Sequence, residues 1–426
     1  MKNWQKICAF LFLAALCVTA TAAGAEPFYL HSGDTVVFYG DSITEQRLYT
    51  LITELYTVTR YPDLKVTFIH SGWGGDRVTG GGGGPIDLRL RRDVFAYKPT
   101  VVTIMLGMND GNYSNHKPAD DETYFNGYRH IVEALRTAIP TVRITAIEPS
   151  PFDDVTRPFT LQPSGYNAVL VNYGDWIRHY ASEKGLAIAD LNKPVVDMLH
   201  TANVSDPETA QKIIADRIHP SLSGHLIMAE QLLKAWNARP LVSAVTIDAA
   251  RSKVVEARFA RITDLRNGPA FGWTELEGAL PLPFAQMLTA DGDRTIGLAI
   301  RSSDITDMLN QEPLRVTGLK PGNYQLTIDG EPIGTWSDAE LGRGVNLAVL
   351  ETPMSKQSTE VRDLTVRHIE IHQFRWRSLQ VPLEGVGLQR LDEALKALDA
   401  VEAEVVVRQR SAAQPRSHVF QLVPAA

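Results

Sequence analysis

The chain has 426 residues, which is long for one domain and favours two structural units. A hydrophobic content of 44% with 21% charged residues is ordinary for a globular protein. The formal net charge of -7 argues against a polyanionic partner such as nucleic acid or an anionic membrane surface.

The N-terminus has the pattern of an export signal. Lys2 and Lys6 precede the apolar run Ile7–Val18, and Ala23-Gly24-Ala25 has the form of a cleavage site. A membrane anchor is the alternative, but the apolar run is shorter than a comfortable membrane span. We therefore expect residues 1–25 to be a signal peptide. The protein is then periplasmic or secreted, without stable membrane insertion after cleavage.

Both cysteines of the chain, Cys8 and Cys17, lie inside this segment. The processed chain would contain no cysteine, which excludes a disulfide, a thiol nucleophile and a thiolate metal site. Removal of Lys2 and Lys6 would leave 40 basic and 49 acidic residues, a net charge near -9.

From residue 26 to residue 240 short apolar runs alternate with longer amphipathic ones. The runs expected to be strands are Thr35–Tyr39, Lys65–His70, Val101–Leu106, Val142–Glu148 and Leu186–Asp190. The stretches expected to be helices are Glu45–Thr59, Ile86–Ala96, Asp121–Ala138, Gly165–Lys184 and Leu222–Trp236. This alternation predicts an α/β domain over 26–240, with a parallel sheet covered by helices on both sides.

Beyond Pro240 the pattern changes to a β-rich region, residues 241–426. The expected strands, in antiparallel company, are Leu241–Val255, Thr295–Ile300, Pro313–Thr317 and Tyr324–Trp336, the last folded into a hairpin at Asp329-Gly330. Two amphipathic helices are expected near the end of the chain, at about Ser358–Leu379 and Leu388–Ala403. From Arg408 onward we expect a frayed end.

Four short blocks in the first domain carry the candidate chemistry. They are GDSIT (Gly40–Thr44), SGWGGDRV (Ser71–Val78), GMND (Gly107–Asp110) and DRIHP (Asp216–Pro220). Each contains a side chain or backbone group with a different role in acyl transfer.

Ser42 follows the first expected strand, at the carboxyl end where α/β sheets place their ligands. In the D-x-x-H turn, Asp216 can accept from one imidazole nitrogen of His219, which leaves the other to take the serine proton. The alternatives are a helix-capping serine and a solvated acid–histidine pair. Together the three residues predict a catalytic triad.

Gly75 and Asn109 could complete an oxyanion hole with the backbone N–H of Ser42. A glycine lets a backbone N–H approach closely, and an asparagine amide provides a second donor. Because Asn109 lies in a turn-like sequence, a purely turn-forming role is the alternative.

These four segments resemble the signature blocks of the SGNH (GDSL-type) hydrolase superfamily over about residues 38–236. The resemblance implies a flavodoxin-like three-layer α/β/α fold and no metal or organic cofactor. It also implies that Ser42 is the nucleophile, Asp216 and His219 complete the triad, and Gly75 and Asn109 are oxyanion donors. The second block departs from the family's usual N-x-G-x-S-G, so Gly74 is the alternative to Gly75.

Other candidates have weaker support. Trp73 and Trp273 could stack on a sugar ring, although a buried aromatic role fits them equally well. The run Gly80–Gly84 is either a mobile lip over the site or a flexible connector. We find no histidine pair at metal-ligand spacing and therefore predict no metal site.

Taken together, the sequence predicts an exported serine esterase that acts on a small-molecule or polysaccharide ester, with O-deacetylation of a carbohydrate as the expected reaction. A lysophospholipase, a short-chain acyl esterase or a thioesterase is the alternative among enzymes. A catalytically inactive glycan-binding protein on the same fold is the alternative from another class.

Overall fold

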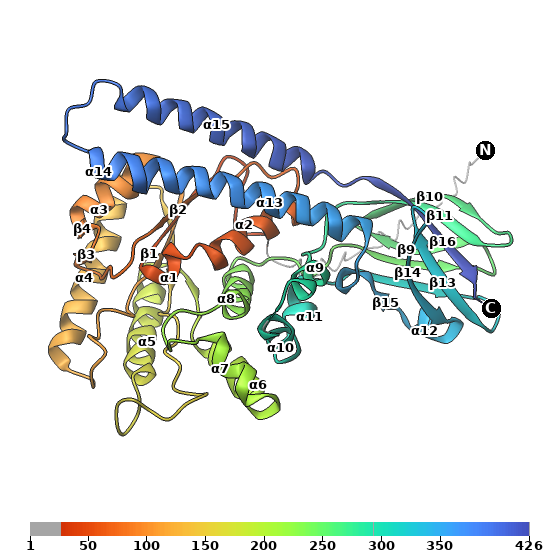
Figure 1. Cartoon of the computed structure of the whole chain (residues 1–426), viewed down its shortest axis with the longest axis horizontal. Coiled ribbons are helices and arrows are strands. Elements are labelled where there is room, and N and C mark those ends of the chain that lie inside the picture. Colours follow the sequence, from red (N-terminus) through yellow and green to blue (C-terminus); the bar gives the residue numbers. More distant parts are fainter. Residues whose placement is uncertain (1–26, 293, 426) are drawn as a thin grey trace, which may run out of the picture.

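The computed structural model describes residues 27–292 and 294–425. The expected signal peptide at residues 1–25 and both cysteines lie outside this part. The described chain contains an α/β region, a β-rich region beside it and two long antiparallel helices that run over the α/β region and end at the β-rich region (Figure 1). None of the described helices is long and apolar enough to cross a membrane.

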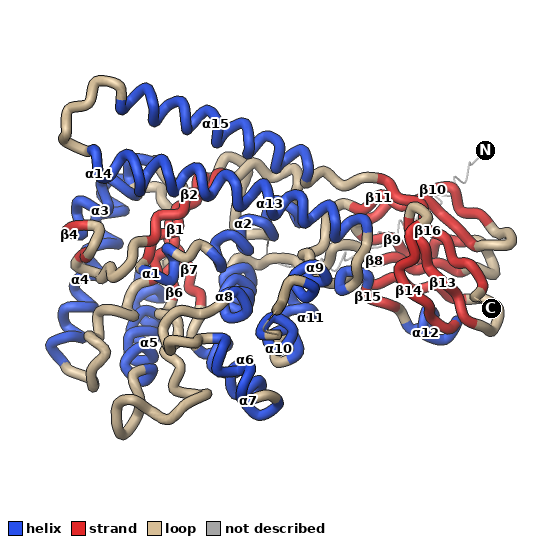
Figure 2. Tube along the Cα trace, viewed as in Figure 1, coloured by secondary structure: helices blue, strands red, loops and turns tan. Residues whose placement is uncertain are grey.

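The centre of the α/β region is a parallel sheet of five strands in the order β2-β1-β5-β6-β7 (Figure 2). Its strands are β1 (Thr35–Gly40), β2 (Thr67–Gly72), β5 (Val101–Met105), β6 (Arg143–Ile147) and β7 (Ala187–Ala189). Almost all of their residues are buried, as expected for strands covered on both faces. The predicted α/β fold is confirmed, and the strand order is that of flavodoxin-like sheets.

Helices cover the sheet. They are α1 (Ser42–Glu45), α2 (Leu48–Arg60), α3 (Ile86–Asp93), α4 (Pro118–Ala138), α5 (Asn167–Lys184), α6 (Lys193–Ser205), α7 (Pro207–Ile213) and α8 (Leu222–Ala235). In one helix layer α2 packs against α8, while in the other α4 packs against α3 and α5. Helices α6 and α7 were not predicted. The expected helices at the other positions are present, with shifted ends.

The β-rich region consists of two sheets. One has five strands, β10 (Ala260–Arg266), β11 (Phe271–Glu277), β16 (Ser417–Pro424), β13 (Asn323–Ile328) and β14 (Glu331–Ser337), in that order. The other has four, β15 (Val345–Asn346), β12 (Pro313–Thr317), β8 (Ala244–Asp248) and β9 (Lys253–Arg258). The short helices of this region are α9 (Phe284–Thr289), α10 (Thr295–Arg301), α11 (Ile305–Leu309) and α12 (Asp338–Arg343). The β-rich assignment and the hairpin at Asp329-Gly330 are confirmed.

Four expectations for this region were wrong. The segment from Thr295 is helix α10, not a strand. Its apolar residues are buried among α6, α7 and α8 and show no helical period, which explains the wrong prediction. Residues 241–255 form two strands, β8 and the start of β9, rather than one. Strand β12 pairs parallel with β8. The tail beyond Arg408 is ordered and ends in β16, the middle strand of its sheet.

Two long helices connect the regions. Helix α13 (Pro353–Gln373) starts with a reciprocal capping box between Thr352 and Ser355, and it continues as a π-helix over Phe374–Gln380 and α14 (Val381–Leu383). Helix α15 (Leu391–Ala412) returns antiparallel to it (Figure 1). Helix α13 packs against α2 and β2, so the second half of the chain covers an edge of the central sheet.

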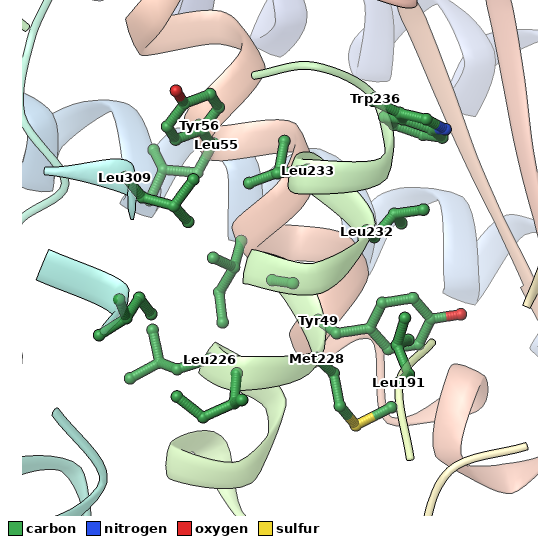
Figure 3. Close-up of a cluster of buried hydrophobic side chains, with 14 of the residues drawn as sticks. Tyr49, Leu55, Tyr56, Leu191, Leu226, Met228, Leu232, Leu233, Trp236 and Leu309 are labelled. Atoms are coloured by element: carbon green, nitrogen blue, oxygen red, sulfur yellow. The ribbon is translucent and has the colours of Figure 1, made fainter. Parts of the chain in front are cut away.

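The hydrophobic core is continuous across residue 240. Buried side chains from both regions belong to one cluster. Figure 3 shows Leu309 of α11 directed into the space between α2 and α8, where Leu55 and Leu233 lie. The described part of the second half therefore covers apolar surface of the α/β region.

A buried polar network also joins the two halves. Glu54 of α2 lies 2.6 Å from Nε2 of His368 in α13 and 3.2 Å from Nε2 of His70 in β2. Gln409 of α15 donates to the same carboxylate at 2.8 Å. Glu402 of α15 lies 3.4 Å from the other nitrogen of His368. All these groups are largely buried, so each can carry a charge only where a partner in the network compensates it.

The network determines which of its members are charged. Burial raises the pKa of Glu54, but the charge of His368 and the hydrogen bonds from both histidines outweigh it and lower the pKa to about 2. Burial lowers the pKa of His368, but Glu54 and Glu402 raise it to about 10. Burial lowers the pKa of His70 to about 4. At neutral pH the pair is therefore Glu54⁻ and His368⁺, beside a neutral His70.

Linkage fixes the pH range over which this pair stabilises the protein. The contribution of Glu54 is present above its unfolded pKa of about 4.5 and is lost as the pH falls toward 2. The contribution of His368 is complete below about 6.5 and is lost as the pH rises toward 10.

We predict that His368→Gln lowers the free energy of unfolding by about 3 kcal/mol at pH 6, because it leaves Glu54 buried without its counter-charge. The difference from the wild type should shrink as the pH approaches 10, where His368 itself loses its proton. Urea unfolding at pH 6, 8 and 10 measures this. His179→Gln is the control, since His179 is 75% exposed. A wild-type–variant difference that is the same at every pH would contradict the assigned charges.

Candidate active site

Ser42 is the first residue of α1, directly beyond the carboxyl end of β1. The side chain of Asp41 accepts a hydrogen bond from the N–H of Ile43 at 3.0 Å and caps this short helix. Gly72, at the end of β2, lets α1 lie against the sheet, because a Cβ there would clash with the backbone nitrogen of Glu45. The local sequence therefore holds Ser42 at the edge of the sheet.

The structure brings Ser42, His219 and Asp216 into one line. Ser42 Oγ lies 2.8 Å from Nε2 of His219. Nδ1 of His219 lies 2.6 Å from Oδ2 of Asp216. Ser42 and His219 are 177 residues apart in the sequence. Both contacts have the length of a hydrogen bond.

The turn that carries Asp216 and His219 is fixed locally. Oδ1 of Asp216 accepts from the N–H groups of Ile218 and His219 at 2.9 and 2.8 Å. Arg217, which follows Asp216, has a φ of +72°, and its side chain donates to the carbonyl of Asp153 at 3.1 Å. Partial burial raises the pKa of Asp216, but these N–H groups and the imidazole outweigh it, so the pKa lies below the ordinary value. The carboxylate of Asp216 is therefore ionised at neutral pH.

In the second block the backbone N–H groups of Gly74 and Gly75 differ in their hydrogen bonding. The N–H of Gly74 donates to Oε2 of Glu45 at 2.7 Å and is occupied. Gly75 has a φ of +75°, which favours glycine, and its N–H has no partner in the part of the chain that the structure describes. Of the two glycines, Gly75 is the one with a free backbone donor.

The amide of Asn109 is held from both sides. Its Nδ2 donates to the carbonyl of Asp76 at 3.0 Å, and its Oδ1 accepts from the hydroxyl of Tyr113 at 2.9 Å. The two hydrogen bonds fix which end of the amide is nitrogen and which is oxygen. The nitrogen has a second N–H that does not take part in them. Asn112 and Tyr113 both have positive φ values, 55° and 50°, which are strained conformations for residues other than glycine.

Below these residues lie two buried carboxyl groups. Burial raises the pKa of Asp41 to about 7, with the nearby Asp110 adding to the shift. Burial likewise raises the pKa of Asp110 to about 7. Oδ1 of Asp110 accepts from the N–H of Val78 at 3.0 Å and so ties the second block to the third. Both carboxyls support loops of the site.

Comparisons with known proteins indicate the family of the α/β region. Residues 38–227 match the GDSL-like lipase/acylhydrolase family. An acetylxylan esterase from Geobacillus stearothermophilus is 24% identical over 226 residues, which cover 48% of this chain and 94% of that protein. A solved structure described as a gut microbial diltiazem-metabolizing enzyme is 25% identical with a TM-score of 0.80, over 94% of this chain and 100% of that chain.

Residues 38–227 are a GDSL-like acylhydrolase domain. The resemblance to SGNH hydrolases is confirmed, and the protein is an ester-hydrolysing enzyme with an additional C-terminal region. Because the similarity to the diltiazem-metabolizing enzyme covers 94% of this chain, the likeness in fold extends into that second half.

The two tryptophans considered as sugar-stacking residues lie in different places. Trp73 adjoins Gly74, but it is largely buried and the guanidinium of Arg377 lies 3.3 Å from its ring centre. Trp273 is buried in β11 of the β-rich region, stacked on Phe420 with its indole N–H donating to Glu275. The structure does not bring Trp273 to the Ser42 site.

The glycine run after the second block has regular structure. It forms a two-residue hairpin, β3 (Gly80–Gly81) with β4 (Gly84–Pro85). The backbone of Gly83 donates to Asp76 at 3.3 Å and accepts from Arg92 at 2.9 Å. Among the described residues, no group of three or more His, Asp and Glu side chains is arranged to hold a metal ion.

Sequence reasoning missed three residues of this site: Tyr113, Glu45 and Arg377. Tyr113 follows Asn109 by four positions, and its bulky side chain in a turn-like loop was the available signal. Glu45 was assigned only to a helix. Arg377 is 332 residues away from its partner Glu45, and no local pattern indicates such a contact.

Proposed function

We propose that this acylhydrolase is a serine esterase in which Ser42, His219 and Asp216 form the catalytic triad. The observation that carries the proposal is the continuous line of contacts from Ser42 Oγ through His219 to Asp216, at 2.8 and 2.6 Å. In the neutral imidazole, Nδ1–H donates to Asp216, so Nε2 is free to accept the serine proton.

The reaction proceeds in two steps. Ser42 Oγ attacks the ester carbonyl carbon while its proton passes to Nε2 of His219, and the tetrahedral intermediate expels the alcohol, which takes that proton. Water then gives a proton to the same nitrogen and attacks the acyl-enzyme. Collapse of this second intermediate releases the acid and returns the proton to Ser42. Asp216 stabilises the imidazolium in both steps.

The oxyanion is held by the N–H groups of Ser42 and Gly75 and by the second N–H of Asn109. Support comes from the free N–H of Gly75, the occupied N–H of Gly74 and the two-sided anchoring of the Asn109 amide. Donors fixed before the charge develops need no rearrangement in the transition state, which is why such sites accelerate acyl transfer.

The proposed substrate class is an O-acetylated carbohydrate. Support comes from the acetylxylan esterase, which is similar over 94% of its own length. The negative charge of this chain is compatible with a neutral polysaccharide and unfavourable for a polyanion. A lysophospholipase, short-chain acyl esterase or thioesterase activity would use the same residues.

Ser42→Ala should reduce the turnover of p-nitrophenyl acetate by at least about 10⁴-fold, since no other group replaces the nucleophile. The fold should persist, because the side chain of Ser42 bonds only to His219 among the described residues, and the His219 side chain is itself 35% exposed. Steady-state kinetics with circular dichroism checks this. Ser205→Ala, which changes a serine at the end of α6, is the control. Full turnover by Ser42→Ala would refute the assignment.

Asn109→Ala should lower kcat by about 10²–10³-fold, as expected for the loss of an oxyanion donor. Tyr113→Phe retains the ring but loses the hydrogen bond that orients the Asn109 amide, so kcat should fall by about 5-fold, which corresponds to about 1 kcal/mol. Tyr324→Phe is the control, because its hydroxyl also makes a 2.9 Å hydrogen bond, to the Lys320 carbonyl in the β-rich region. Equal kcat values for the two tyrosine variants would exclude the orienting role.

A substrate panel separates the proposed class from its alternatives. We expect the wild type to release acetate from acetylated xylan and xylo-oligosaccharides with kcat/KM at least about tenfold above that for lysophosphatidylcholine or an acyl-thioester. Ser42→Ala provides the background rate. Preferential release of fatty acid from the lysophospholipid would overturn the substrate class and leave the triad intact.

A further inference from the structure

The helix that starts as α13 changes from α-helix to π-helix where it faces the second block. After α13 the backbone continues as a π-helix over Phe374–Gln380. Such segments are rare and often lie at functional sites. Two consecutive side chains of this segment, Trp376 and Arg377, reach the acylhydrolase domain, whereas Arg375 turns toward α15 and pairs with Asp399.

Arg377 is connected through one carboxylate to the loop that carries Gly74 and Gly75. Its Nη2 donates to Oε1 of Glu45 at 2.8 Å. The other oxygen of Glu45 accepts from the N–H of Gly74 at 2.7 Å. The guanidinium also lies 3.3 Å from the ring centre of Trp73. Arg377 therefore contacts the residue before Gly74 and the acceptor that holds Gly74.

Trp376 reaches the same loop by a second path. It is fully buried, and its indole N–H donates to Asp93 at 2.6 Å. Asp93 is paired with Arg89, which donates to the carboxylate of Asp76 at 2.5 Å. The carbonyl of Asp76 in turn accepts from the amide of Asn109 at 3.0 Å. Both paths end at residues that flank the proposed oxyanion donors.

We propose that Arg377 is a positioning residue for the oxyanion hole, supplied by the C-terminal region and acting through Glu45. The inference rests on the proposed function, since it assigns a purpose to the Gly74–Gly75 geometry. Without Arg377, the part-buried carboxylate of Glu45 loses its salt bridge, while the nearby Arg47 bonds the Glu45 backbone carbonyl instead. The Gly74–Gly75 peptide then loses a rigid acceptor. The N–H of Gly75 then points less accurately at the developing oxyanion, and small misplacements of such donors are costly.

Arg377→Met tests this, with Arg375→Met as the matched control from the same π-helix. We expect Arg377→Met to lower kcat for p-nitrophenyl acetate by about 10-fold with KM unchanged, because the donor acts in the transition state. Arg375→Met, which loses a pair to α15, should change kcat by less than about twofold. Thermal unfolding of both variants shows whether stability alone accounts for the difference.

A double-variant cycle with Glu45→Gln shows whether the effect passes through Glu45. The glutamine can still accept from Gly74 but no longer pairs as an anion with Arg377. If Arg377 acts through Glu45, Arg377→Met should have little further effect in the Glu45→Gln background. Fully additive effects on kcat would overturn the inference.

Phosphorylation of Ser42 by diethyl p-nitrophenyl phosphate gives an independent readout, because the phosphoryl oxygen occupies the oxyanion site. Its rate should fall in Arg377→Met in parallel with kcat. Equal kcat values and phosphorylation rates in Arg377→Met and Arg375→Met would refute the positioning role. Turnover that survives Ser42→Ala would instead refute the proposed function, so the two failures are distinguishable.

Discussion

The parallel pairing of β1 with β2 on one side and with β5 on the other is the constraint on which the site depends. Gly40 of β1 lies opposite Gly72 of β2 and Met105 of β5, so the three strands end at one line. The three loops that follow carry Ser42, Gly75 and Asn109. Because the chain reverses its winding direction here, these loops diverge and leave room for a ligand. Side chains far apart in sequence therefore meet at one edge of the sheet.

Buried ion pairs then connect this edge to the second half of the chain. Arg89, Asp93 and Trp376 form one contact region beneath the second block, and Glu54 with His368 forms another along α2. Such pairs add little net stability relative to apolar packing, but breaking one leaves a buried charge unpaired. These pairs therefore determine the position of the C-terminal helices on the α/β region more than they strengthen the packing between the two.

The sequence predicted what depends on local pattern. The five central strands and the hairpin at Asp329-Gly330 follow from apolar runs and turn chemistry. Three of the four blocks follow from their residue types at the ends of strands, whereas the fourth, Asp216–Pro220, precedes helix α8 and follows from its D-x-x-H spacing. Helix α10 was missed because a short apolar run buried on several sides has no period. Strand β16 was missed despite the alternating burial of His418, Phe420 and Leu422. The pair Arg377–Glu45 depends on tertiary contact alone.

The most direct measurement of the central claim is covalent labelling by a fluorophosphonate followed by peptide mass spectrometry. The account predicts one stoichiometric adduct on Ser42, and loss of labelling in His219→Ala, because the serine proton then has no acceptor. An adduct on a different serine, or unchanged labelling without His219, would contradict the assigned triad.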